Sequence, residues 1–217
     1  MKGFILLISA IAFAVATCTA QDFKSTLKKT FDEFESTQDQ AQKTQLSNKL
    51  GLIAKKWNNE WTAHYYYAFS QAVLSYNEKD KTKADAYVDE AEKEFDDMKS
   101  IQGKENDETY VLAAMIANAR LAVNPSNRWQ KYGKIFSEDL QKAKGLNPDN
   151  PRIYYLQGVS KFHTPKMFGG GKKNSLPYFE KAEPLFAKES SDDIAKPYWG
   201  KNENQYFLAQ CKGDDKE

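Results

Sequence analysis

The chain has 217 residues, and 31 Lys and Arg stand against 30 Asp and Glu, which gives a formal net charge of +1. A net charge this close to zero argues against a nucleic acid or an anionic membrane held by bulk electrostatics. The length is that of one domain.

The first 20 residues are predicted to be a signal peptide. Lys2 gives a positive start, residues 4–16 are apolar except for one serine, and small residues precede Ala20. The apolar run is shorter than the roughly 20 residues that span a bilayer. We therefore expect cleavage after Ala20 and export to the periplasm or the medium. The four residues ending at Cys18 resemble a lipobox, with Thr where a smaller residue is usual, so a lipoprotein anchored through Cys18 is the alternative.

The mature chain, residues 21–217, is expected to be a single domain with a repeat of 45 residues. One set of residues at helical offsets 0, 3, 4 and 7 recurs twice at this spacing, and a second set recurs between the copies of the first. The first set is Tyr65, Ala68, Phe69, Ala72; then Tyr110, Ala113, Ala114, Ala117; then Tyr155, Gly158, Val159, Phe162. The second is Leu46, Leu50, Ile53; then Ala91, Phe95, Met98; then Phe136, Leu140, Ala143, with a fourth copy, Ser175, Phe179, Ala182, after only 39 residues.

Two alternating helix types at one period predict stacked helical hairpins. Gly, Pro, Asn and Asp fall between the periodic segments, where they end helices. The predicted helices are 22–35, 38–56, 59–76, 82–99, 106–123, 128–144, 151–163, 173–188 and 197–211. We therefore expect an all-α solenoid of about four hairpins with a C-terminal capping helix.

The best-matching unit resembles a tetratricopeptide repeat. Tyr110, Ala113, Ala114 and Ala117, followed by Phe136, Leu140, Ala143 and Pro148, follow the order of that motif, in a unit longer than the usual length of about 34 residues. Residues 164–171, followed by 176–182, look like a segment of exported tetratricopeptide-like proteins of Bacteroidetes-type bacteria. The resemblance implies a fold and a compartment, and it implies no activity.

The first helices of such a stack line its concave side, so they supply the candidate binding residues. The first repeated set of residues forms one stripe along each first helix. Counting from this stripe predicts an uncharged, largely apolar groove, which suits a peptide or a partner helix. Its residues are Tyr66, Ser70, Val111, Met115, Asn118, Leu156, Ser160, His163 and Asn204. The leading expectation is thus a non-enzymatic exported adaptor that binds a protein or peptide.

Two other interpretations of these positions stay open. A small-ligand-binding accessory protein of an envelope transport system would hold its ligand near Tyr66, Asn118, Ser160 and His163. Alternatively, the groove positions are filled by the protein's own N-terminal helix or by crowding between repeats.

The glycine run Gly169, Gly170 and Gly171 is the sharpest local motif. A phosphate-binding P-loop would need Gly at position 166 and Ser or Thr at 173, and Lys stands at both. We expect these glycines to allow positive φ and a close approach to a neighbouring hairpin, with simple anion capture as the alternative.

Catalytic, metal and cofactor sites are not predicted. His64 and His163 are the only histidines and lie far apart in the sequence, without a ligand-like partner at i+4. Carboxylates between Asp89 and Asp97 alternate with lysines, which is typical of a solvated helix face. After cleavage, Cys211 is the only cysteine, which excludes an intramolecular disulfide, and a buried, inert thiol is expected.

Overall fold

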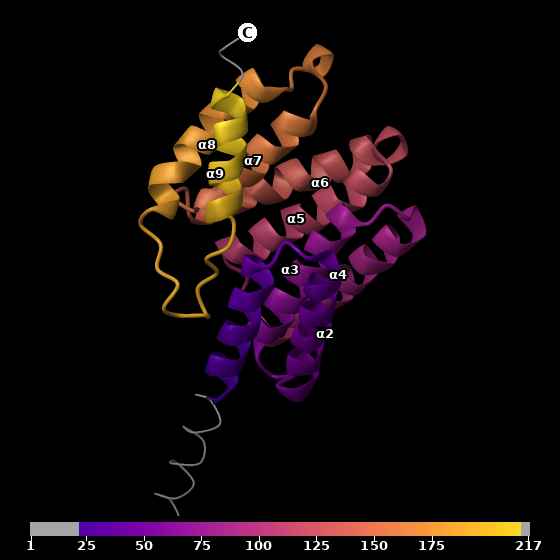
Figure 1. The fold of residues 1–217 in the computed structure, drawn as a ribbon, viewed down its shortest axis with the longest axis vertical. Helices are drawn as coiled ribbons and strands as arrows, with labels where there is room; N and C mark the ends of the chain where they lie inside the picture. Colours follow the sequence, from indigo (N-terminus) through magenta and orange to yellow (C-terminus); the bar gives the residue numbers. More distant parts are fainter. Residues whose placement is uncertain (1–21, 214–217) are drawn as a thin grey trace, which may run out of the picture.

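The computed structural model describes residues 22–213, and all regular structure in this range is helical (Figure 1). The predicted signal peptide and Cys18 lie outside the described residues. A helix at residues 22–36 is followed by α2 (Gln40–Lys56), α3 (Trp61–Asn77), α4 (Lys81–Gln102), α5 (Asp107–Val123), α6 (Pro125–Leu146), α7 (Pro151–His163), the short 3-10 helix η1 (Lys166–Phe168), α8 (Lys172–Phe186) and α9 (Lys201–Lys212). The all-α prediction is confirmed.

The helices begin where side chains can accept hydrogen bonds from first-turn amides. Asp39, Asp80 and Asn150 each cap a helix in this way, and Asn106 forms a capping box at the start of α5. Pro151 occupies the first turn of α7, where its missing N–H costs nothing. Short polar connections therefore set the hairpin boundaries.

Consecutive helices pack as antiparallel hairpins, and the hairpins stack along the long axis of the molecule (Figure 1). Helix α3 pairs with α4, α5 with α6, and α7 with α8, while α9 packs against α8. Contacts of α3 with α5 and of α5 with α7 join successive hairpins through their first helices. This arrangement confirms the predicted hairpins and the C-terminal capping helix.

The repeated stripe forms the core most completely in α3. There Tyr65, Ala68, Phe69 and Ala72 are all buried. In α5 and α7 the equivalent tyrosines remain partly exposed. The stripe therefore lies at the centre of the stack in α3 and nearer the surface in the later hairpins.

Residues 187–200, here called the return segment, run from α8 back toward the N-terminal helix (Figure 1). The Tyr66 hydroxyl donates to the backbone carbonyl of Ile194 over 3.0 Å, and the Tyr198 hydroxyl donates to the Asp32 carboxylate over 2.6 Å. The last helix was predicted to begin at residue 197, but α9 begins at Lys201. Residues 197–200 belong to the return segment, because Tyr198 binds helix 22–36 at the opposite end of the stack.

Trp199 anchors the return segment in the core. Its indole Nε1 donates to the Tyr65 hydroxyl over 2.9 Å, and its ring lies 4.7 Å from that of Phe69. Because both partners belong to α3, the C-terminal segment completes the hydrophobic core of the second hairpin.

Candidate ligand-binding site

Most residues of the predicted groove are buried. Helix 22–36 and the return segment cover α3, and the Phe31 ring lies 4.3 Å from that of Tyr66. At Tyr66, this corresponds to the alternative in which the protein's own N-terminal helix fills the groove. The buried residues are Tyr66, Ser70, Val111, Met115, Leu156 and Asn204. As a description of an open surface, the predicted groove is wrong at these six positions.

Three predicted residues, Asn118, Ser160 and His163, do reach the surface. The Asn118 amide donates to the Tyr76 hydroxyl over 3.1 Å, and that hydroxyl donates to the backbone carbonyl of Met115 over 3.1 Å. Tyr76, which the sequence analysis missed, keeps 40% of its surface exposed. A contact of Asn118, Ser160 or His163 with a ligand stays a prediction.

Asn118 and His163 belong to a larger accessible surface, which we call the inner face. Tyr155 lies between its two halves: its ring lies 6.5 Å from that of Phe207, and burial, followed by the neighbouring Glu203, Tyr76 and Glu35, raises its pKa. The inner face consists of Glu35, Tyr76, Asn118, Tyr155, Phe162, His163, Glu203 and Phe207, all exposed or half-buried. Its residues come from helix 22–36, α3, α5, α7 and α9.

Aromatic rings dominate the end of the inner face nearest α9. The Phe207 ring lies 5.0 Å from Phe162 and 5.9 Å from His163, and it stacks on the buried Phe179 at 5.4 Å. These separations are those of interacting aromatic pairs. The cluster therefore presents an aromatic surface with one imidazole at its edge.

Several titratable groups of the inner face are uncharged at neutral pH. Burial and the neighbouring Glu203 carboxylate raise the pKa of Glu35 to about 8. Burial also raises the pKa of Tyr76 and Tyr155 and lowers that of His163. These side chains are partly buried and uncharged, and they still reach the surface. The inner face therefore suits a mainly apolar ligand.

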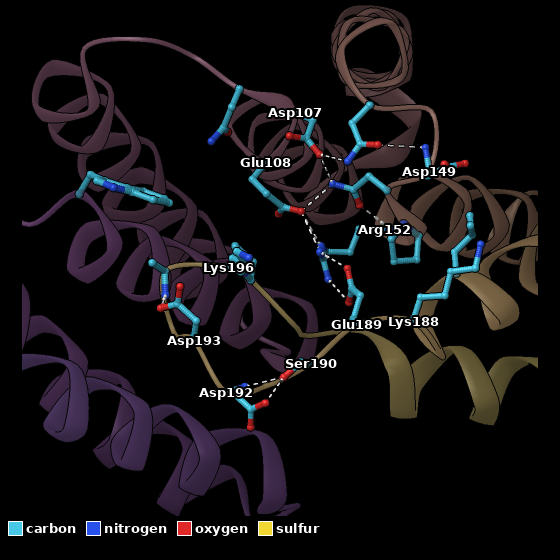
Figure 2. A pocket seen from close by; sticks show the side chains of 18 residues that line it. Asp107, Glu108, Asp149, Arg152, Lys188, Glu189, Ser190, Asp192, Asp193 and Lys196 are labelled. Atoms are coloured by element: carbon cyan, nitrogen blue, oxygen red, sulfur yellow. Dashed lines mark hydrogen bonds and ion pairs between the residues drawn. The ribbon is translucent and has the colours of Figure 1, made fainter.

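A cavity of about 650 Å³ lies at the other end of these helices (Figure 2). It is lined by the start of α3, the starts of α5 and α7, and the return segment. At its centre, the buried Arg152 guanidinium binds Glu108 over 2.8 Å and Glu189 over 2.6 Å. Asn150 donates to both Asp107 and Glu108.

The buried arginine of this cavity is paired within the protein, and the lining carries an excess of acidic residues. Its lining contains six acidic residues, Asp107, Glu108, Asp149, Glu189, Asp192 and Asp193, against three basic ones, Arg152, Lys188 and Lys196. The ion pairs of Arg152 tie α5, α7 and the return segment together. An acid-rich cavity whose only arginine is already paired on two sides suits a structural role better than an anionic ligand.

A second cavity of about 740 Å³ is lined by the loop after α4 and the last turn of α6. Tyr110 is its one aromatic residue, and the Lys142 ammonium lies 5.2 Å from the centre of that ring. One ring with a lysine over it offers less aromatic surface than the inner face.

The glycine run folds back on its own hairpin. Gly169 and Gly171 have φ of 78° and 91°, so the prediction of positive φ is confirmed. A Cβ at Gly170 would lie 2.0 Å from the carbonyl oxygen of Thr164. The close approach therefore involves the preceding turn. The prediction of a close approach to a neighbouring hairpin is wrong.

His64 is buried in an ion pair that the sequence analysis missed. Its Nδ1 lies 2.6 Å from a carboxylate oxygen of Glu94 on α4, and this contact is the main cause of a raised His64 pKa. His64, Glu94 and Asp97 have ligand atoms close enough to hold a metal ion. The Lys93 ammonium already bridges the two carboxylates, at 2.8 and 3.3 Å.

The acidic face of α4 is more than a solvated surface. Arg120 of α5 is buried and forms ion pairs with Asp85, Asp89 and Glu92. Together with Glu94, these carboxylates hold α4 onto α3 and α5. Sequence spacing alone did not show this role, because Arg120 and His64 lie on other helices.

Comparison with known proteins places the chain in a family. No protein-family model and no curated protein matches it. Among solved structures, it is similar to the HusA haemophore from Porphyromonas gingivalis, with 33% identity and a TM-score of 0.74 over 90% of this chain and 95% of that chain. The chain belongs to the HusA family.

Membership of the HusA family agrees with the expected likeness to helical proteins of Bacteroidetes-type bacteria. The tetratricopeptide resemblance goes no further than the helical-hairpin arrangement, since no family model supports it. Within residues 22–213, none of the helices is long and apolar enough to cross a bilayer.

Proposed function

We propose that this chain is an exported, non-enzymatic protein that binds haem. The observation that carries the proposal is its 33% identity to the HusA haemophore across 95% of that protein. Haem capture corresponds to the small-ligand alternative of the sequence analysis. The peptide adaptor has less support, because most of its groove residues are buried.

The inner face is the surface that best fits this ligand. A porphyrin is a broad, flat and mainly apolar ring, so it gains most from aromatic surface and loses most beside fixed charges. Phe162 and Phe207 supply rings, and Tyr76 and Tyr155 remain uncharged at neutral pH. The acid-rich cavity of Figure 2 would instead repel the two propionates of haem.

His163 is the inner-face residue suited to bind the iron. Imidazole is a common axial ligand of haem, and it must be neutral to offer a lone pair. Burial lowers the pKa of His163, which keeps the ring neutral at pH 7. The side chain is exposed at the end of α7, beside the Phe207 ring. We infer that His163 binds the iron while the porphyrin covers Phe207.

Asn118 and Ser160 are the residues that we propose to orient the polar edge of the ligand. Asn118 uses one amide N–H to bind the Tyr76 hydroxyl, and it has a second to donate. Ser160 lies on α7, one turn before His163, and is partly exposed. Both would donate to propionate oxygens without adding charge to the inner face.

Haem titration of the mature protein tests the proposal. We expect saturable binding with a shifted Soret band, and we expect His163→Ala to change the band and weaken binding of haem. Metal-free protoporphyrin is the matched ligand, because its affinity should not depend on His163. Absence of haem binding by the wild type would falsify the proposed function.

Control variants separate the function from its location. Tyr110→Ala alters the second cavity and Lys188→Ala the cavity of Figure 2, and neither should change haem affinity. If the wild type binds haem with an affinity that Tyr110→Ala or Lys188→Ala lowers and His163→Ala does not, haem binding stands, and the assignment of the site to the inner face is wrong.

Export rests on residues outside the described part of the chain. The signal peptide at 1–20 and the alternative anchor at Cys18 remain predictions from the sequence. Mass spectrometry of the protein isolated from both the membranes and the medium of its own host separates them, because a chain beginning at Gln21 carries no lipid and a lipoprotein begins at a modified Cys18.

A further inference from the structure

The tip of the α7–α8 hairpin, residues 164–171, presents two large apolar side chains to solvent. Met167 is 81% exposed and Phe168 is 69% exposed. They are the two most exposed large apolar residues in the described part of the chain. Such exposure indicates an interaction when the side chains lie together, and here they are adjacent.

The backbone holds these two side chains outward. The Gly171 amide donates to the Lys161 carbonyl over 2.9 Å, and the Gly170 amide donates to the Pro165 carbonyl over 3.2 Å. The positive φ of Gly169 ends the short helix η1, which carries both apolar residues. The exposure of Met167 and Phe168 is therefore a property of an ordered turn.

The tip also lies within an acid-free part of the chain. Between Asp149 and Glu180 there is no Asp or Glu. Four lysines flank the two apolar residues in this stretch: Lys161, Lys166, Lys172 and Lys173. Although the whole protein has almost no net charge, the segment around the tip carries a local excess of positive charge.

We propose that this tip docks on an anionic lipid surface. Met167 and Phe168 enter the boundary between head groups and acyl chains, and the lysines remain at the level of the lipid phosphates. A convex turn with two adjacent apolar side chains and surrounding lysines fits a lipid surface better than a protein groove. The proposal does not depend on haem binding.

Co-sedimentation with vesicles tests the proposal on the mature protein. We expect binding to mixed phosphatidylglycerol–phosphatidylcholine vesicles and little binding to phosphatidylcholine alone. Met167→Ser/Phe168→Ser should weaken this binding about tenfold or more, since it removes the inserted apolar surface. Lys166→Gln should weaken it about fivefold, and added salt should weaken it further.

A matched control uses two other exposed apolar residues. Leu52 on α2 is 68% exposed and Leu146 on α6 is 56% exposed, so Leu52→Ser/Leu146→Ser removes similar surface elsewhere and should leave vesicle binding unchanged. Circular dichroism and haem titration of both double variants check the fold and the haem site. The proposal is overturned if the wild type ignores anionic vesicles, or if the two double variants lose binding equally.

Discussion

Glu35 makes the stability of this protein depend on pH in an unusual direction. Its carboxyl group lies on the inner face, where burial and the Glu203 carboxylate raise its pKa from 4.5 to about 8. The folded state therefore holds the proton more tightly than the unfolded chain between these two values. The free energy of unfolding should fall as pH rises through this window and level off above it.

The size of the effect follows from the displacement of the pKa. At about 1.4 kcal/mol per pH unit, the change from 4.5 to about 8 sets an upper limit of about 5 kcal/mol. Because the Glu35 side chain is only half-buried, solvent screens part of this amount. We expect a loss of about 1–3 kcal/mol between pH 5 and pH 9.

Urea unfolding of Glu35→Gln, followed by circular dichroism, measures this contribution. A neutral amide avoids the cost of ionisation, so the variant should match the wild type at about pH 5 and exceed its stability by about 1–3 kcal/mol at pH 9. Glu203→Gln should make this loss smaller and complete it at a lower pH, because removal of the Glu203 carboxylate lowers the pKa of Glu35.

A surface control isolates the inner face. Glu183 on α8 is exposed, so Glu183→Gln should leave the pH profile unchanged. If Glu35→Gln and Glu183→Gln follow the wild type in parallel from acid to alkaline pH, Glu35 is not held in its protonated form and its description as an uncharged group of the inner face is wrong.

Two further predictions concern packing. Arg152→Leu should lower the free energy of unfolding by about 3–5 kcal/mol, because it leaves the buried Glu108 carboxylate without its cation; a urea midpoint close to that of the wild type would contradict this. Gly158→Ala should destabilise by about 1–3 kcal/mol, since its Cβ would lie 2.6 Å from the Phe179 ring. Gly145→Ala on α6 meets no atom within 4 Å and should stabilise slightly; thermal melts showing the same sign for both glycines would refute the packing argument.

The sequence predicted the helices well because their signals are local. The helical stripe and the polar caps depend on residues a few positions apart, so the hairpin order could be derived directly. Helix α6 begins at Pro125 and not at 128, because proline is accepted in a first turn. The return segment could not be foreseen, since Trp199 and Ile194 bind tyrosines more than a hundred residues away.

The site was harder to predict because accessibility depends on what covers each helix. Counting along a helix shows which residues face its own hairpin partner, but α3 is also covered by helix 22–36 and the return segment. Tyr66 is therefore buried, whereas Asn118 and His163, on later hairpins, stay accessible. Glu35 and Phe207 were missed because they belong to the two terminal helices, where counting from the repeat gave Asn204 alone and that residue is buried.

The contact between the return segment and helix 22–36 changes how the chain should fold. In an open solenoid each repeat touches only its neighbours, so an end can fray or be removed while the rest survives. Here Asp32 and Tyr198 are 166 residues apart and bonded, which joins the first hairpin to the last. Such distant pairing slows folding, and it makes loss of either terminus a loss for the whole molecule. The described residues should therefore unfold as a single cooperative unit, with no partly folded form that keeps only half of the stack.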